Sequence, residues 1–555
     1  MIRFAPWVTL LLMAAPLAAP AAAQELLQDV KLPHADEAAS RITENFILGH
    51  TRYLSSDLLE GRGPGTRGDS LAQAYVAAQF ETLGLEPAGP DGSWLQTVPL
   101  VSMTSTAPDV LTIGGPGGET LDLRRVDEWI AYTGKQEPRT SLADAEIVFV
   151  GYGIVAPEED WDDYKGTDLS GKVLLFLNND PTGDRFAGNT RLYYGRWTYK
   201  YEIAAEKGAA AAFIIHTTPS AGYAWQVVQS SFGGTEFELP APPDEKRLEV
   251  RGWLTEDAAG RVVALGGHDL GELVAAAQRP DFEPVALGVT VDLEITTAIE
   301  ESATANVIGR LPGGDRAGEA VLYTAHFDHL GIGQPVEGDS IYNGAVDNAL
   351  GTSTMLAIAR AFAHLPERPS RSILFAAVGA EEQGLLGSEF LGRHPPLPAC
   401  DLFANINLDT GNFWGRTLDV PQIGGGKSDL DQWLDRFARE QGRVVEPEPF
   451  PDRGYFYRSD QFNLAKVGVP ALYLEGGIKT VEGGPERGRE ISEQWLAERY
   501  HQPSDEILES WDLSGQVEDA RLLFRVGYAV AQAATAPAWN PGDEFAAARA
   551  ACSTP

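Results

Sequence analysis

The stretch SILFAAVGAEEQGLLGSEFL, from Ser372 to Leu391, decides the fold. Its first nine residues form an apolar run typical of a strand, and QGLLGSEFL has the spacing of a helix. Glu381 and Glu382 stand side by side between the two. Two adjacent carboxylates repel each other when both are buried, so a positive charge has to join them. The stretch therefore raises the question of which cation lets the pair share one site.

The same alternation of strand and helix runs through the second half of the chain. It begins near Ala305 and is typical of an α/β domain with a largely parallel sheet. Sites in open sheets of this kind assemble beyond the carboxyl ends of the strands. The other predicted strands are NVIGRL, AVLYTAHFD, LFANINLD and VPALYLEGG, and the other predicted helices are GTSTMLAIARAFAHL and DLDQWLDRFAREQG.

Length, charge and the first residues restrict the class of protein. A chain of 555 residues is too long for one ordinary core, so two domains or one domain with an insertion are expected. The formal net charge of −36 argues against nucleic acid or an anionic membrane as a partner. Arg3, an apolar run and the small residues Ala21 to Ala23 predict a signal peptide over residues 1–23, hence export to the periplasm or the medium. A retained membrane anchor is the alternative, which Pro16 and Pro20 disfavour.

The chain has two cysteines, Cys400 and Cys552. Two isolated thiols lack the clustered spacing of a cysteine zinc site. An exported chain can join them in a disulfide, and the sequence leaves that pairing open.

Five stretches deliver acids or a histidine at the end of a strand or loop. Taken singly, each has an ordinary structural explanation: Asp347 alone would be a helix N-cap, and the glutamate pair an exposed helix start. A lone His-x-Asp pair is more often a surface pair. Taken together, in this order, they form a strong pattern. The stretches are HFDHLG (326–331), GAVDNALG (344–351), GAEEQG (379–384), NINLDTGN (405–412) and RYHQPSD (499–505).

With these motifs the chain resembles the zinc-dependent aminopeptidase family of co-catalytic exopeptidases, which also contains glutamate carboxypeptidases and glutaminyl cyclases. The likeness covers nearly the whole mature chain and includes the entry segment LSSDLLEGRGPGTRG, Leu54 to Gly68. The resemblance implies a three-layer α/β/α exopeptidase domain on a mostly parallel mixed sheet, with two zinc ions per chain. Zinc takes imidazole nitrogen and carboxylate oxygen, so the implied cofactor agrees with the residue types.

The resemblance also assigns the metal ligands. Asp347 would bridge the two ions, because two metals roughly 3.5–4 Å apart share one carboxylate. His326 and Asp409 would hold the first ion, and Glu382 and His501 the second. In relatives the peptide bond after the bridging aspartate is cis, and we expect the same after Asp347. Zinc would thus neutralise one glutamate of the opening pair.

Further roles follow from the same likeness. Glu381 would stay unligated, act as general base toward the metal-activated water and later protonate the leaving amine. Asp328 would accept the second N–H of the metal-binding histidine, and Tyr500 would stabilise the oxyanion. Arg458 is expected to face the substrate backbone or carboxylate, with Asp460 orienting it, although a structural salt bridge is an equal alternative. His329 is expected to pack or to hydrogen-bond rather than to bind metal.

A β-rich module interrupts the domain. Helices are predicted at Ala38–Leu59 and Leu71–Leu83, after which short apolar strands surround one helix, Tyr201–Lys207. The module resembles a protease-associated domain. Its aromatic stretch Tyr193–Glu202 either roofs the cleft or, as the stronger interpretation, packs in a core. The predicted organisation is a catalytic domain over 24–133 and 285–536, an inserted module over 134–284 and a peripheral tail over 537–555.

The leading hypothesis is an exported di-zinc aminopeptidase that removes N-terminal residues from peptides. A carboxypeptidase or dipeptidase of the same family is the first alternative. A receptor-like binding protein without catalysis is the second, and the complete ligand set argues against it. The complete set also disfavours a glutaminyl cyclase, since those relatives typically use one zinc. No stable membrane anchor and no nucleic-acid partner are expected, and the sequence sets no oligomeric state.

Overall fold

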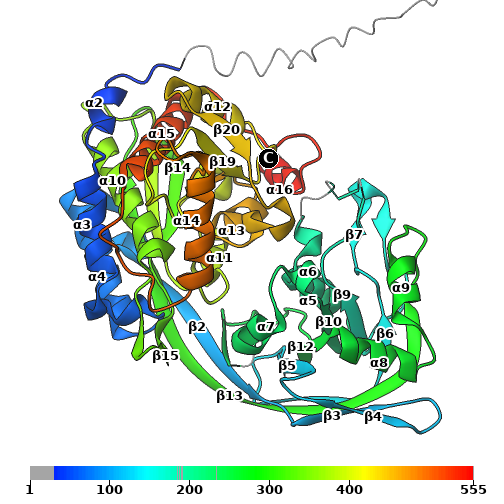
Figure 1. Ribbon diagram of the computed structural model, residues 1–555. Helices are drawn as coiled ribbons and strands as arrows, with labels where there is room; N and C mark the ends of the chain where they lie inside the picture. The colour runs from blue at the N-terminus through cyan, green and yellow to red at the C-terminus, as the bar shows by residue number, and fades with distance from the viewer. Residues whose placement is uncertain (1–29, 184, 187, 189–191, 233, 554–555) are drawn as a thin grey trace, which may run out of the picture.

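The computed structural model describes residues 30–183, 185–186, 188, 192–232 and 234–553 (Figure 1). The predicted signal peptide, residues 1–23, lies outside this range. No helix within the range has both the length and the apolar character that a membrane span requires.

A mixed sheet lies at the centre of the larger unit. Its four inner strands, in the spatial order β17, β14, β18, β21, pair in parallel. An antiparallel neighbour flanks them on either side, β13 beside β17 and β19 beside β21, and β20 closes the edge. The strands are β13 (Val285–Leu311), β14 (Arg316–His326), β17 (Arg371–Val378), β18 (Leu402–Asn407), β19 (Asp419–Ile423), β20 (Val444–Pro447) and β21 (Ala471–Leu474).

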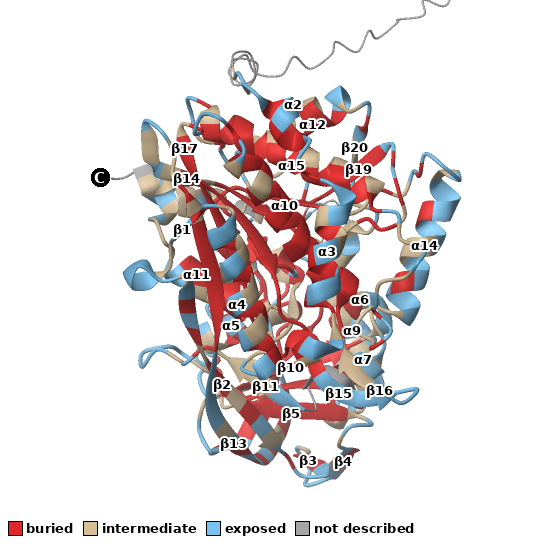
Figure 2. Cartoon of the chain, turned by 90° about the vertical axis from the view of Figure 1, so that its left-hand side faces the viewer, coloured by how far each residue is buried: buried red, intermediate tan, exposed pale blue. Residues whose placement is uncertain are grey.

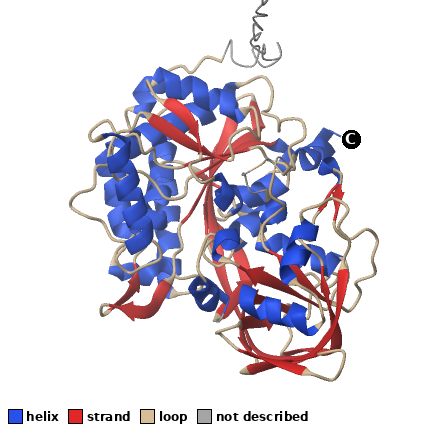
Figure 3. Cartoon of the chain, turned by 45° about the vertical axis from the view of Figure 1, so that its right-hand side comes forward, coloured by secondary structure: helices blue, strands red, loops and turns tan. Residues whose placement is uncertain are grey.

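Helices cover both faces of this sheet, and the alternation along each strand explains why. In β17, Phe375 packs toward one face and Leu374 toward the other, and every residue of the strand is buried (Figure 2). Strands buried on both faces are typical of the middle layer of an α/β domain. The predicted three-layer fold with a mostly parallel mixed sheet is therefore confirmed (Figure 3). One face carries α3 (Glu44–Leu54), α4 (Arg67–Thr82), α10 (Gly351–Ala363), α12 (Leu430–Glu440) and α15 (Ser514–Gln532), and the other α11 (Leu386–Arg393) and α13 (Gln461–Lys466).

The predicted helix over Ala38–Leu59 is wrong as a single element. The structure divides it into α2 (Ala35–Ala39), α3 and the 3-10 turn η1 (Asp57–Arg62). Thr43 interrupts the helical backbone, since it is extended, with φ −135° and ψ 150°. Threonine is favoured at the residue that starts a helix, and here it starts α3.

A second hydrophobic core lies in a β-rich unit. Its parallel strands are β6 (Arg139–Phe149), β9 (Val173–Leu177), β10 (Ala211–His216) and β12 (Val250–Thr255), with β5 (Trp129–Thr133) antiparallel at one edge. This core extends from Ala107 to Ile295, so the unit reaches beyond the predicted limits of 134 and 284 at both ends. The reason is strand pairing. The residues before 134 form β3 (Val110–Gly114), β4 (Thr120–Arg124) and β5, which pair within this unit or with β13.

Two long antiparallel strands join the units. Strand β2 (Leu95–Thr106) pairs with residues 296–307 of β13, which spans 27 residues. The first part of β13 pairs with β6 of the β-rich unit, whereas its end pairs with β17 of the central sheet. The chain therefore leaves and re-enters the larger unit on neighbouring strands, which Figure 1 shows as the long ribbon between the two bodies.

The aromatic stretch Tyr193–Glu202 packs in hydrophobic contacts and does not cover the cleft. Tyr199 and Tyr201 are buried in the core of the β-rich unit. The Tyr193 ring instead meets the larger unit, with its centroid 4.9 Å from that of Phe462 and 6.1 Å from that of Tyr457. The stretch thus supports one core and one contact between units.

The C-terminal segment is not peripheral, contrary to the prediction. Trp539 and Phe545 are buried against Phe456, because their large apolar rings find a common pocket beside β21. Cys552 forms a disulfide with Cys400, which resolves the pairing that the sequence left open.

Removing this disulfide is expected to destabilise the protein by about 2–4 kcal/mol, since the bond closes a loop between residues 152 positions apart. The measurement is chemical unfolding with and without a thiol reductant. The double variant Cys400→Ser/Cys552→Ser serves as the control and should not respond to the reductant. An unchanged wild-type midpoint, with both thiols titrated as free, would contradict the expectation.

Candidate metal centre

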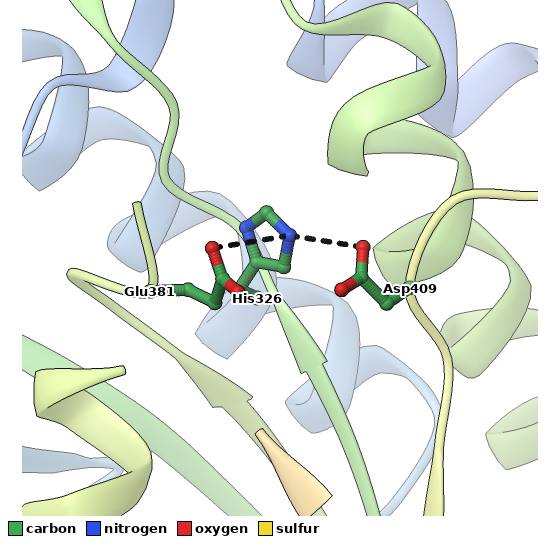
Figure 4. A group of neighbouring side chains, drawn as sticks. All are labelled: His326, Glu381 and Asp409. Carbon is green, nitrogen blue, oxygen red and sulfur yellow. Dashed lines mark hydrogen bonds and ion pairs between the residues drawn. The ribbon is translucent and has the colours of Figure 1, made fainter. Parts of the chain in front are cut away.

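Three strands of the central sheet end at the candidate site. His326 is the last residue of β14, and Asp409 follows the end of β18. Glu381 and Glu382 follow the end of β17. Because β17, β14 and β18 are parallel neighbours, their carboxyl ends meet at one edge of the sheet. Figure 4 shows the His326 ring between the carboxylates of Glu381 and Asp409.

Two further side chains reach the site, one from a helical turn and one from a loop. Asp347 lies in η5 (Ala345–Leu350), a single π-helical turn that leads into α10. His501 follows α14 (Gly484–Glu498), a largely exposed helix (Figure 2). The peptide bond between Asp347 and Asn348 is cis, which confirms the expectation drawn from the family resemblance.

The bridging geometry is centred on Asp347. Its Oδ1 lies 3.3 Å from His326 Nε2, and its Oδ2 lies 3.3 Å from His501 Nε2. On one side His326 Nε2 is also 3.3 Å from Asp409 Oδ1. On the other side His501 Nε2 is 3.1 Å from Glu382 Oε2. The five predicted ligands therefore form two groups that share one carboxylate.

Divalent metal fits this donor set. The Nε2 atom of His501 is buried and close to two carboxylates, yet it makes no hydrogen bond of acceptable geometry. Imidazole and carboxylate atoms that crowd one point without hydrogen bonding are typical of metal ligands, and oxygen with imidazole nitrogen is the set that zinc prefers. His326, Asp347 and Glu382 bring ligand atoms within 4.8 Å of one another, as do His326, Glu381 and Asp409.

Charge supports the same conclusion. Burial raises the pKa of the Glu381 carboxyl well above its usual value, and the neighbouring Asp409 and Glu382 raise it further. Burial lowers the pKa of His501, but Glu382 and Asp347 outweigh it and raise that pKa to about 10. Both shifts arise from carboxylates crowded into one buried site. A bound cation would balance this negative charge, which answers the question raised by the glutamate pair.

Asp328 does not play its predicted part. Its carboxylate is 3.8 Å from His326 Nδ1, beyond hydrogen-bond distance, and the nearer atom is its own backbone oxygen at 3.3 Å. The carboxylate instead accepts the backbone N–H groups of Glu381, at 3.1 Å, and Glu382, at 3.4 Å. Because these amides sit at the turn after β17, Asp328 orients the glutamate pair rather than the histidine.

Asp505 is a site residue to which the sequence assigned no role. Its Oδ2 accepts the backbone N–H groups of Val346 and Asp347, both at 3.1 Å, and its Oδ1 accepts Trp495 Nε1 at 3.1 Å. It therefore links the turn of the bridging aspartate to the helix that precedes His501. The signal was present, since Asp505 closes the stretch RYHQPSD.

Other contacts surround the ligands. His329 Nδ1 lies 2.6 Å from Glu382 Oε1, so this histidine forms a hydrogen bond with a predicted ligand, in agreement with the prediction that it packs or hydrogen-bonds. Ser459 Oγ donates to Asp409 Oδ2 at 2.5 Å. Such partners fix the orientation of ligand side chains.

A cavity of about 630 Å³ opens onto the site. Tyr500 and Arg458 line it, as the predicted roles require. Asp460 precedes α13, is fully buried and does not line the cavity, so its role in orienting Arg458 stays a prediction. The walls are largely aromatic and also carry charge; they include Phe413, Trp414, Phe450, Tyr455, Tyr473, Arg453, Arg489, Glu475 and Glu493.

Comparison with known proteins decides the family. Residues 306–524 match the model of peptidase family M28. This part of the chain belongs to that family. The M28 segment begins in β13, ends in α15 and contains all five predicted ligands, and it confirms the resemblance drawn from the motifs.

The curated proteins that the chain matches include aminopeptidases. The chain is 34% identical over 151 residues to aminopeptidase NAALADL1 of Mus musculus, covering 25% of this chain and 18% of that protein. It is 30% identical over 161 residues to aminopeptidase YwaD of Bacillus subtilis strain 168, covering 28% and 32%. The chain thus spans less than a third of the length of either relative. Among solved structures, the aminopeptidase from Aneurinibacillus sp. strain AM-1 is 20% identical, with 92% and 97% of the chains covered and a TM-score of 0.48.

Proposed function

We propose that the protein is an exported di-zinc exopeptidase that removes N-terminal residues from peptides. The observation that carries the proposal is the position of Asp347 between two imidazole rings. One of its carboxylate oxygens lies 3.3 Å from His326 Nε2, and the other lies 3.3 Å from His501 Nε2. The M28 match and the aminopeptidases among the relatives support the reaction class. The disulfide supports export, since such bonds persist in oxidising compartments.

The proposed ligand assignment follows the two groups of donors. His326 and Asp409 would hold one ion, Glu382 and His501 the other, and Asp347 would contact both. When bound, zinc polarises the substrate carbonyl and lowers the pKa of the attacking water.

Glu381 is the proposed general base. It lies partly buried beside His326, with Oε2 4.0 Å from the ring nitrogen, and it also lines the cavity. It is therefore placed to take a proton from the attacking water and to return it to the leaving amine.

Tyr500 is the proposed oxyanion donor. Its ring stacks on that of His501, with centroids 3.9 Å apart, and it lines the cavity. Burial raises the pKa of the Tyr500 hydroxyl well above its usual value, and the carboxylate of Asp347 raises it further. The hydroxyl thus keeps its proton at neutral pH and can donate it in a hydrogen bond to the developing oxyanion.

A carboxypeptidase or dipeptidase activity is the second candidate. The observation that favours it is a set of three cavity arginines, Arg453, Arg458 and Arg489, none of which has an ion-pair partner within the described part of the chain. Free guanidinium groups recognise carboxylates. A substrate with a free carboxyl end would satisfy them.

A peptide labelled at both ends separates these candidates. The proposed aminopeptidase releases the N-terminal residue of a free peptide and leaves the N-acetylated peptide intact. Release of the C-terminal residue from the N-acetylated peptide would overturn the aminopeptidase assignment in favour of the second candidate.

Arg458→Ala is expected to raise KM about tenfold for dipeptides with a free carboxyl end, with little change in kcat, because a charge-assisted hydrogen bond is lost in ground and transition state alike. The measurement compares each dipeptide with its C-terminal amide, for which the variant should behave as wild type. Arg52→Ala, at an exposed arginine on α3 that does not line the cavity, is the control. Equal effects on acid and amide would contradict carboxylate binding by Arg458.

A further inference from the structure

A fully buried arginine from the N-terminal segment lies behind the candidate metal centre. Arg62 is the last residue of η1, and its side chain is 0% exposed. The guanidinium donates to four backbone carbonyls. Nε donates to Phe327 O at 2.6 Å, and Nη2 donates to Gly344 O at 3.0 Å. Nη1 donates to Leu54 O at 2.5 Å and to Asn343 O at 2.7 Å.

These carbonyls belong to the segments that carry the ligands. Phe327 directly follows His326, and the pair Asn343 and Gly344 leads into the turn of Asp347. The backbone oxygen of Arg62 also accepts the N–H of His329, at 3.4 Å, and the ring of His329 contacts Glu382. One side chain therefore joins two ligand segments to the end of α3, and its backbone reaches a third ligand through one intermediate.

The positive charge of Arg62 has no direct partner. Within the described residues, no carboxylate lies within ion-pairing distance of its guanidinium. Burial lowers the pKa of Arg62 to about 10, against the carboxylates of Asp328 and Asp505, which raise it. The group is thus charged at neutral pH. Burying a guanidinium without an ion-pair partner costs free energy. The hydrogen bonds to four carbonyls and the negative charge of the nearby acidic centre together offset that cost.

The backbone of η1 is shaped to point this side chain inward. Glu60, Gly61 and Arg62 all have left-handed φ angles, of 50°, 68° and 51°. A Cβ at position 61 would lie 2.5 Å from Gly331 O and 2.6 Å from Tyr342 O, so only glycine fits there. This explains the Gly-Arg pair of the entry segment, to which neither the ligand set nor the proposed mechanism assigns a role.

We propose that Arg62 is a positioning residue of the metal centre. Its planar guanidinium spans the strand end after His326 and the turn before Asp347, and holds them at a fixed separation before metal binds. The inference rests on the proposed metal site and adds to it a residue that precedes the nearest ligand by more than 260 positions.

The test is the zinc affinity of Arg62→Lys, measured by competition with a chromophoric chelator. Lysine keeps the charge but donates from a single atom, so it cannot span the four carbonyls. Loss of a group that orients metal ligands typically weakens metal binding by about 10–100-fold, and we expect that loss here, with an altered cobalt absorption band. Unchanged affinity in folded Arg62→Lys would overturn the proposal.

Arg371→Lys is the matched control. Arg371 is also buried, and its guanidinium donates to Val530 O, Ala533 O and Glu319, but it lies at the start of β17, at the end of the strand opposite the site. This variant is expected to lose stability and to bind zinc as wild type does. An equal loss of affinity in both variants would overturn the specific role of Arg62. Arg62→Gln removes the charge, and tighter zinc binding in that variant would show that Arg62 acts only as a repelling charge, which also contradicts positioning.

Wild-type protein provides a measurement that does not depend on a variant folding. If Arg62 fixes the site, backbone amides at 326–329 and 344–348 exchange hydrogen at rates within about tenfold in the metal-free and zinc-loaded protein. Protection gained only with zinc, by more than about 100-fold, would overturn the proposal. Failure of wild type to bind zinc at all would instead refute the proposed function, so the two failures are distinguishable.

Discussion

Glu381→Gln is expected to lower kcat by about 10²–10⁴-fold while both metal ions stay bound, because the amide cannot accept the proton that a general base removes. The side chain lines the cavity and is not among the five proposed ligands. Glutamine has nearly the same size, so the neighbouring contacts remain. The measurements are steady-state kinetics and metal content of the same preparation.

Glu382→Gln is the matched control at the adjacent position. Glu382 contacts His501 and His329 and is one of the five proposed ligands, so this variant is expected to lose occupancy of one metal. The two variants thus distinguish the proposed general base, Glu381, from the adjacent metal ligand, Glu382. If Glu381→Gln loses metal and Glu382→Gln keeps it, the roles of the pair are reversed. If both behave alike, neither assignment stands.

Removing metal is expected to abolish activity, and zinc or cobalt should restore it. All five proposed ligands are oxygen or imidazole donors, which suit both ions. Rebinding should also stabilise the fold, by about 4 kcal/mol when free zinc exceeds its Kd about 1,000-fold. Dialysis against a chelator, with metal analysis and thermal unfolding before and after, provides the measurement.

Magnesium and calcium serve as controls for the reconstitution, since they prefer sites built from oxygen alone and should restore little. Full activity in protein whose metal loss has been verified would refute the metallopeptidase proposal. Loss of activity that zinc cannot restore, together with loss of secondary structure, would point to unfolding instead.

Some of the site could be predicted because its residues sit at the ends of predictable strands. His326, Glu381 and Asp409 each follow an apolar run, and parallel strands bring their carboxyl ends to one edge. For His501 and Asp347 the metal-ligand role depends on the family resemblance. His501 lies in a loop after a helix and Asp347 in a turn before another helix, and no local pattern indicates that the two come together. The structure gathers all five, with Asp347 in the middle.

The predictions that failed depend on contacts between distant segments. The family likeness predicts a bond between Asp328 and His326, yet backbone amides in the turn after the neighbouring strand β17 compete for the Asp328 carboxylate. The terminal segment was judged peripheral from its alanine content. Two buried rings and one disulfide attach it to the larger unit instead.

The sequence by itself determined the alternation of strands and helices after Ala305 and the acidic and histidine motifs, because each depends on periodicity or spacing within a few residues. The five motifs together carried the resemblance to the family. Only the tertiary structure decided where β13 passes from one unit to the other, that Asp505 and Asp328 hold backbone amides, and that Arg62 reaches the ligand segments. The features of Asp328, Asp505 and Arg62 rest on side chains that hydrogen-bond to backbone atoms of remote residues. Backbone groups are the same in every residue, so no sequence pattern marks the partner, and only the packed chain brings donor and acceptor together.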